Sequence, residues 1–247
     1  PPYVRQEDIT DPEGILEPKA YKEHLQETMA LDFPKYFTGK KKIDGKSDLY
    51  TYFYLRSLHL LNEKGIHVFI CSNSWLDAGY GTGMQEFLLS KVPIRWIMDN
   101  HARRSFANAD VNTIISVMDA PLRNGQVPDE HLVKFIAFKK PFIESIFTEK
   151  LLELDQAFDI LKNDVFRVYP ITNRKLYDVG WELEKTSQSK AAGQYVGDKW
   201  GGKYLKAPDI FFNILEKRSE RLVKLNNVAD VLTITWSRLG NNSNIII

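Results

Sequence analysis

The sequence contains very little cysteine and no long apolar segment. Its single cysteine, Cys71, excludes an internal disulfide framework and fits a reducing compartment. No run reaches the roughly 18 consecutive apolar residues that a membrane-spanning helix needs, so a membrane protein is not expected. An excess of one charge is also lacking. The formal net charge of +1 neither requires nor excludes a nucleic-acid partner, because basic residues can be confined to one groove.

What remains is typical of a soluble globular α/β protein. Four short apolar runs predict strands, and polar segments with helical spacing predict helices between them. Ser47 is the expected N-cap of one helix, and Gly65 is expected to end it. Because strands alternate with helices, we expect a parallel sheet covered by helices. The predicted strands cover residues 66–71, 94–98, 112–118 and 132–138, and the predicted helices 18–28, 48–62, 83–89, about 142–161 and 208–215.

The chain opens with Pro1-Pro2-Tyr3. Two prolines fix an extended, rigid backbone, which can hold a carbonyl toward a ligand. The tyrosine that follows offers a flat ring for stacking. This combination suits an exocyclic amine on a planar ring, such as that of adenine. The tripeptide alone is more typical of a proline turn followed by a core tyrosine.

Further segments follow Pro1-Pro2-Tyr3 in a fixed order along the chain. The ordered set resembles the Asn-Pro-Pro-Tyr class of DNA adenine-N6 methyltransferases, and within it the Eco57I-like restriction–modification methylases. The resemblance covers residues 1 to about 230, whereas the last residues, 232–247, do not match the family. The segments that carry it are Asp48-Leu49-Tyr50-Thr51-Tyr52-Phe53, Ser72-Asn73-Ser74-Trp75-Leu76, Tyr80-Gly81, Ile97-Met98-Asp99 and Phe106-Ala107-Asn108-Ala109-Asp110.

The resemblance implies a fold and a domain division. Residues 1–162 would be the C-terminal half of a Rossmann-like, S-adenosylmethionine-dependent methyltransferase sheet. Residues 163–247 would be a linker and the start of a target-recognition domain. In the family's strand order, the strand near residue 115 runs antiparallel and is inserted between the strands near 69 and 97.

The resemblance also implies roles for five residues. Pro1, Pro2 and Tyr3 would form the catalytic loop, in which the first proline's carbonyl accepts from the target amine and Tyr3 stacks on the flipped base. Phe106 would pack on the other side of that base. Phe53 would border the adenosyl part of the cofactor, S-adenosylmethionine. Without the resemblance, Phe53 is equally well explained as a core residue of an amphipathic helix, and Phe106 as a hydrophobic anchor of a loop. No metal is expected, because His and Cys do not cluster at metal-binding spacing.

Three basic clusters are candidates for contacts with DNA phosphates, although a solvated charged surface explains each of them more simply. The expected partner is double-stranded DNA, and a restriction nuclease, fused or separate, is a candidate second partner. The resemblance implies a cytoplasmic protein of a prokaryote. The clusters are Lys40, Lys41 and Lys42, then Arg103 and Arg104, then Lys139 and Lys140.

Other conspicuous residues receive structural interpretations. Cys71 lies in a predicted buried strand and is expected to be an inert core residue. Trp75 and Tyr80 are expected to serve packing. No nucleophile stands at a recognisable spacing from His59, His67 or His101, so they receive no catalytic role.

The family's asparagine would directly precede Pro1, and its glycine-rich cofactor loop and ribose-binding acidic residue would lie further upstream. The resemblance therefore predicts that these 247 residues alone neither methylate DNA nor bind S-adenosylmethionine tightly. Two alternatives stay open. One is a methyltransferase acting on RNA or on a protein glutamine. The other is a non-catalytic DNA-binding or specificity module, which would bind DNA in a salt-dependent manner without methylating it.

Overall fold

The structure of the chain is a computed structural model, and it describes all residues except 40, 103–110, 183–193 and 219–247. The chain divides into two compact units, Pro1–Ala207 and Pro208–Ile247. In the second unit the described structure is one helix, α7 (Asp209–Arg218). None of the helices in the described ranges is long and apolar enough to cross a membrane.

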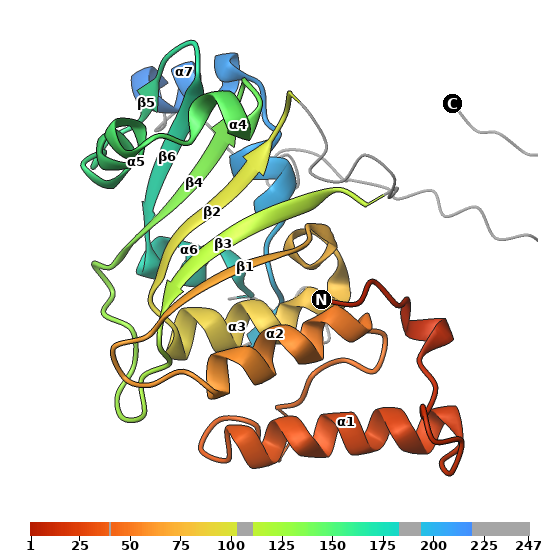
Figure 1. The fold of residues 1–247 in the computed structure, drawn as a ribbon. Coiled ribbons are helices and arrows are strands. Elements are labelled where there is room, and N and C mark those ends of the chain that lie inside the picture. The colour runs from red at the N-terminus through yellow and green to blue at the C-terminus, as the bar shows by residue number, and fades with distance from the viewer. Residues whose placement is uncertain (40, 103–110, 183–193, 219–247) are drawn as a thin grey trace, which may run out of the picture. The chain divides into compact units, whose positions relative to one another are not determined.

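A mixed six-stranded sheet forms the centre of the first unit, with the strand order β1-β3-β2-β4-β6-β5 (Figure 1). β3 is antiparallel to both β1 and β2, and β4 is parallel to β2 and antiparallel to β6. The strands are β1 (Ile66–Ser72), β2 (Ile94–Asn100), β3 (Thr113–Asp119), β4 (Leu132–Phe138), β5 (Leu161–Lys162) and β6 (Phe166–Thr172).

The two faces of the sheet pack against different helices. One core contains the inward residues of α2 (Leu49–His59), α3 (Thr82–Lys91) and α6 (Asn173–Gly180), with the π-helical turn η4 (Gly201–Leu205). The other core lies against α4 (Phe142–Ser145) and α5 (Thr148–Asp155). β4 shows the alternation directly, because Val133 and Phe135 belong to the first core and Ile136 and Phe138 to the second.

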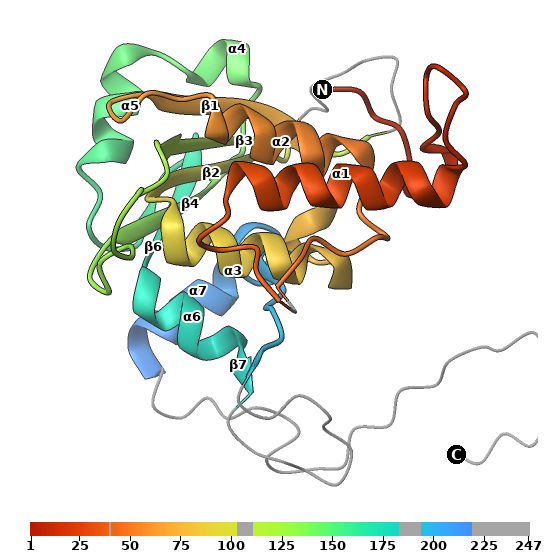
Figure 2. The same ribbon diagram turned by 90° about the horizontal axis from the view of Figure 1, so that it is seen from below.

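Outside α2 lies a further helix, α1 (Pro18–Asp32), and the two lie side by side in both ribbon views (Figures 1 and 2). Pro18 occupies the first turn of α1, where its missing N–H costs no hydrogen bond. The remaining elements are short: η1 (Gln6–Asp8), η2 (Ser74–Leu76), η3 (Gly79–Gly81), β7 (Trp181–Glu182) and β8 (Gln194–Tyr195).

Four of the long strands, β1 to β4, were predicted to within two residues, whereas β6 was not predicted, and the expectation of a parallel sheet is wrong. β1 and β2 do run in the same direction, as the α3 crossover between them requires. They are not hydrogen-bonded to each other, however, because β3 is inserted antiparallel between them. The strand insertion implied by the family resemblance is therefore confirmed, while the simple reading of strand–helix alternation is not.

Three predicted helix features need correction. The N-cap of α2 is Asp48 rather than Ser47, and α2 ends at His59, well before Gly65. The expected helix over residues 142–161 consists of two short helices and the start of β5. It breaks because Phe147 takes an extended backbone conformation, with φ −118° and ψ 156°.

The boundary expected at residues 162 and 163 lies between β5 and β6, two paired strands of the same sheet. The boundary between the two compact units lies later in the chain, between Ala207 and Pro208. The assignment of residues 163–247 to a linker and a recognition domain stays a prediction.

Candidate active site

Three strands end at one edge of the sheet. β1, β2 and β4 run in the same direction, so Ser72, Asn100 and Phe138 lie along this edge, where β3 begins at Thr113. Backbone hydrogen bonds tie the chain together here. The amide of Asn73 donates to the carbonyl of Asn112 over 3.0 Å, and the amide of His101 donates to that of Phe138 over 2.9 Å. Ligands of open α/β sheets characteristically bind at such carboxyl ends of strands.

The segment that follows Pro1-Pro2-Tyr3 is fixed to the start of α2. The carbonyl of Val4 accepts from the amide of Leu49 over 3.1 Å, and the amide of Gln6 donates to the Asp48 carboxylate over 2.9 Å. The Asp48 carboxylate thus anchors the opening segment. It makes no capping hydrogen bond to the backbone of α2. The contact with Gln6 explains why an aspartate stands before α2.

Tyr3 and Cys71 lie close enough at this edge for a charge on Cys71 to affect the pKa of Tyr3. Burial raises the pKa of Tyr3, and the negative thiolate form of Cys71 adds to that rise. Cys71 is fully buried near the end of β1, and burial raises its pKa to about 12, a shift that the Pro1 amino group opposes. The thiol is therefore protonated and unreactive at neutral pH, as predicted.

The loop after β1 is packed tightly below this edge. Trp75 is fully buried and packs edge-to-face on Trp200 with ring centroids 5.8 Å apart. The Tyr80 and Tyr50 hydroxyls are hydrogen-bonded over 2.8 Å. A Cβ at Gly81 would lie 1.9 Å from the carbonyl oxygen of Trp75, so only glycine fits there. The packing roles expected for Trp75 and Tyr80 are confirmed.

Phe53 lies on α2, and its side chain is 48% exposed. A core residue of this helix would be covered, as Tyr54 and Leu55 beside it are. The interpretation of Phe53 as a core residue is therefore wrong. Its exposed ring is compatible with a ligand contact, which stays a prediction.

The basic candidates differ in the contacts that their side chains already make within the protein. Lys41 forms an ion pair with Glu86 over 2.7 Å and lies over the Tyr36 ring, whereas Lys42 is exposed. Lys139 and Lys140 follow β4, and the Lys139 ammonium donates to the carbonyl of Asn163 over 3.0 Å. The other candidates lie outside the described residues: Lys40, Arg103, Arg104 and the base-stacking candidate Phe106.

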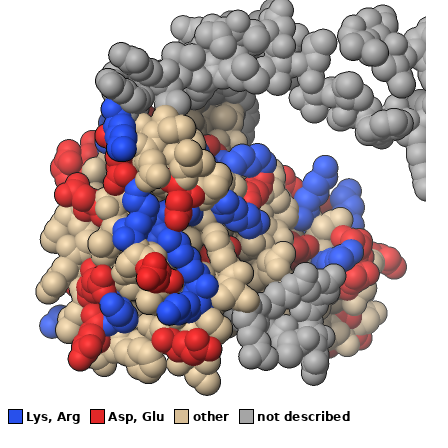
Figure 3. Space-filling view, turned by 90° about the horizontal axis from the view of Figure 1, so that it is seen from above, with Lys and Arg blue, Asp and Glu red and all other residues tan. Residues whose placement is uncertain are grey.

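On the face shown in Figure 3, basic side chains gather in the middle and acidic ones surround them. A groove of about 850 Å³ lies beside Tyr80 and is bordered by Lys41 and Lys42. Its wall includes a stack of rings, because Tyr177 lies 5.4 Å from both Trp181 and Tyr195 at small interplanar angles. Flat rings beside basic side chains are the features that bind unpaired nucleotides.

Sequence reasoning gave no role to Asp99 or Gln85. Asp99 is buried at the end of β2, with its carboxylate 3.8 Å from the His101 imidazole. Burial raises the pKa of Asp99, and the positive charges of His101 and Lys206 oppose that rise. The sequence feature that could have pointed to Asp99 is its position as an acidic residue at the end of an apolar run. Buried carboxyls of this kind are candidates for proton exchange at a site.

Gln85 is buried on α3 and carries hydrogen bonds at both ends of its amide. Its nitrogen donates to the carbonyls of Leu76 and Asp198, each over 3.1 Å. Its oxygen accepts from the Tyr195 hydroxyl over 3.2 Å and from the Asp198 amide over 3.1 Å. It joins the loop after β1 to a segment more than 100 residues away, which no local sequence pattern signals.

Residues 1–106 match the model of the Eco57I restriction-modification methylase family. Over these residues the chain is similar to that family. The matched segment begins with the Pro1-Pro2-Tyr3 loop and includes α2, β1, α3 and β2. The match thus includes the ends of β1 and β2 at the candidate edge, and it agrees with the resemblance found in the sequence.

The chain is also similar to a curated relative and to a solved structure. The chain is 32% identical over 108 residues to the type II methyltransferase M.BstVI of Geobacillus stearothermophilus, covering 44% of this chain and 16% of that protein. It also resembles the type IIG restriction endonuclease BpuSI, with a TM-score of 0.49 and 15% identity, covering 72% of this chain and 19% of that structure. The chain thus spans under a fifth of both proteins, and the TM-score is too low to decide the fold.

Proposed function

We propose that this chain forms the substrate-side part of a DNA methyltransferase that transfers a methyl group from S-adenosylmethionine to N6 of an adenine flipped out of duplex DNA. The observation that carries the proposal is the Eco57I family match, which begins at Pro1-Pro2-Tyr3. The contacts of Val4 and Gln6 with α2 support it, because they hold the segment after the loop at the start of α2, beside the carboxyl edge of the sheet.

In this proposal the loop binds and orients the target base. The Pro1 carbonyl accepts a hydrogen bond from the amino group and so directs the nitrogen lone pair outward. Tyr3 stacks on one face of the base, and Phe106 packs on the other. Stacking and edge hydrogen bonds offset the few kcal/mol that base extrusion costs. Acceleration then comes from positioning and electrostatics, without a metal.

The half-exposed ring of Phe53 fits a contact with the adenosyl part of S-adenosylmethionine. When bound, the cofactor supplies an electrophilic methyl group. Phe53 is the single cofactor contact proposed within this chain, and one aromatic contact contributes only about 1–3 kcal/mol. We therefore propose that residues 1–247 alone bind the cofactor weakly and do not methylate DNA.

Double-stranded DNA is the proposed partner. The aromatic groove beside Tyr80, with Lys41 and Lys42 on its border, supports a path for unpaired nucleotides. Lys139 and Lys140 would meet phosphates at the end of β4, and a restriction nuclease would act on the same DNA. Phosphate contacts of this kind position a protein without reading sequence.

The test is methyl transfer from labelled S-adenosylmethionine to duplex DNA by the gene product that contains these residues. We expect Tyr3→Ala to lower kcat/KM by about 10- to 100-fold, because base stacking is worth about 1–3 kcal/mol. Tyr3→Phe keeps the ring and should retain most activity. Tyr21→Ala, which removes a half-buried tyrosine of α1, is the matched control.

Two results would decide against the proposal. Wild-type activity in Tyr3→Ala would exclude the stacking role. Salt-dependent DNA binding without any methyl transfer would instead favour the non-catalytic specificity module, and transfer to RNA or to a protein glutamine would favour the other alternative.

A further inference from the structure

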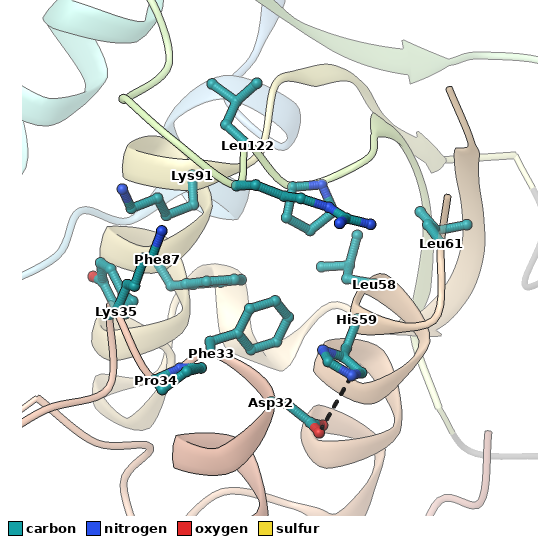
Figure 4. Close-up of a pocket in the computed structure, with 13 residues that line it drawn as sticks. Asp32, Phe33, Pro34, Lys35, Leu58, His59, Leu61, Phe87, Lys91 and Leu122 are labelled. Atoms are coloured by element: carbon teal, nitrogen blue, oxygen red, sulfur yellow. Dashed lines mark ion pairs between the residues drawn. The ribbon is translucent and has the colours of Figure 1, made fainter. Parts of the chain in front are cut away.

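A cavity of about 490 Å³ lies between the C-terminal ends of α1, α2 and α3 and the loop after β3. Its volume is in the range of small-molecule sites. Phe33, Leu58 and Phe87 form its apolar floor, and Pro121 and Leu122 close it on the loop side. Figure 4 shows the Phe33 ring between the side chains of Phe87 and His59.

This cavity is remote from the candidate active site. The catalytic loop is fixed at the start of α2, through Val4 and Leu49, whereas the cavity lies at the other end of α2, at Leu58 and His59. The 11 residues of α2 span about 16 Å. The cavity therefore faces the opposite edge of the sheet and cannot be part of the base-binding site.

Two lysines converge on one side of the cavity. The Lys35 ammonium donates to the Asn124 side-chain oxygen over 3.0 Å, and the Lys91 ammonium donates to the carbonyl of Gly125 over 2.7 Å. Both partners are neutral and adjacent in the chain, so two positive charges are held at one turn. Figure 4 shows Lys35 and Lys91 on the same side of the cavity. An anion between them would relieve their repulsion.

The opposite side carries a carboxylate. The Asp32 side chain is only 5% exposed. Its Oδ1 accepts from Arg56 and lies 3.8 Å from the His59 imidazole, while its buried Oδ2 has no hydrogen-bond partner among the described residues. A buried, unsatisfied acceptor is costly. A ligand N–H, admitted by a small shift of the half-exposed His59 ring, would satisfy it.

These features define a ligand with three parts: a flat apolar ring, an N–H donor on one side and an anion on the other. We infer that the cavity binds a nucleotide, with its base over Phe33 and facing Asp32, and its phosphate between Lys35 and Lys91. The half-exposed Leu61 and the exposed Arg123 border the remaining rim. The inference is independent of the proposed methyltransferase activity, because no catalytic residue takes part.

Calorimetric titration of the 247-residue chain with adenosine and guanosine 5′-monophosphates, separately, tests the inference. We expect saturable binding of at least one with a Kd below about 1 mM, and binding of its nucleoside at least about tenfold weaker. The double variant K35Q/K91Q should weaken nucleotide binding by at least about tenfold. The matched control K19Q/K64Q removes two exposed lysines outside the cavity and should leave binding unchanged.

Amide hydrogen exchange provides a second measurement that does not depend on a variant. Nucleotide should protect residues 31–36 and 121–125 and leave residues 1–6 unaffected. Binding should also persist in Tyr3→Ala, which separates this cavity from the base-binding loop. Absence of saturable binding by either nucleotide, equal binding by K35Q/K91Q, or loss of binding in Tyr3→Ala would each overturn the inference.

Discussion

His67 is a buried residue of β1 whose ring is held neutral. Burial lowers its pKa to about 4. Ser57 Oγ lies 2.7 Å from Nε2 and donates its own hydrogen to the carbonyl of Tyr54, so Nε2 must donate to Ser57. Nδ1 has no hydrogen-bond partner in the described part of the chain. Protonation would place a charge and an unsatisfied N–H at this atom, which explains the direction of the shift.

This histidine predicts a pH dependence of stability. Between its folded pKa of about 4 and the ordinary value of about 6.5, the unfolded chain binds the extra proton, so stability is full above the higher value and falls as pH drops. From pH 7 to pH 4 the contribution lost is about 2–3 kcal/mol. His67→Gln, measured by urea unfolding at several pH values, should flatten this dependence. The exposed control His24→Gln should keep it, and an unchanged slope in His67→Gln would contradict the account.

At the scale of elements, α2 is joined to the sheet by a buried hydroxyl pair. Tyr54 is fully buried, and its hydroxyl donates to the Ser116 hydroxyl of β3 over 2.7 Å. Tyr52, two residues earlier on α2, is also buried, but its hydroxyl has no hydrogen-bond partner among the described residues. The two tyrosines therefore separate the effect of a hydrogen bond from that of burial.

We expect Tyr54→Phe to lower the free energy of unfolding by about 1–2 kcal/mol, because it leaves a buried hydroxyl on Ser116 without its donor. Tyr52→Phe removes an unsatisfied hydroxyl and should be neutral or stabilising. The shift in the urea midpoint at constant slope measures both. Equal destabilisation by the two variants would show that the hydrogen bond does not anchor α2.

The elements themselves were largely predictable, and their pairing was not. Residues 132–138 form an apolar run whose limits match β4. Nothing local in residues 112–118 indicates that β3 inserts between β1 and β2, because that choice depends on partners more than 40 residues apart. Phe147, whose side chain is 56% exposed, interrupts an otherwise helical pattern with an extended backbone conformation that the local sequence does not indicate.

At the scale of the whole molecule, the segment around residues 194–206 packs on the six-stranded sheet. Trp200 and Tyr204 are buried against Phe135 of β4, and Arg167 donates to the carbonyl of Leu205 over 2.6 Å. The sequence resemblance assigned this segment to the linker and the start of a recognition domain. The long-range hydrogen bonds of Gln85 that fix this segment could not be predicted from local patterns.

Gln85→Met should release this segment. The variant leaves several buried backbone groups without partners, and we expect a loss of about 2–4 kcal/mol in unfolding free energy. Amide hydrogen exchange should rise over residues 194–206 before the sheet is affected. Gln156→Met, an exposed substitution after α5, serves as the control. Unchanged exchange in this segment would contradict the role assigned to Gln85.

The central claim is tested most directly by identifying the methylated product. Duplex DNA treated with the gene product and labelled S-adenosylmethionine would be digested to nucleosides and analysed by mass spectrometry. The proposed base-holding loop predicts that the label appears in N6-methyladenine and nowhere else in the DNA. Label in C5-methylcytosine, or none in DNA while RNA or protein is labelled, would contradict it.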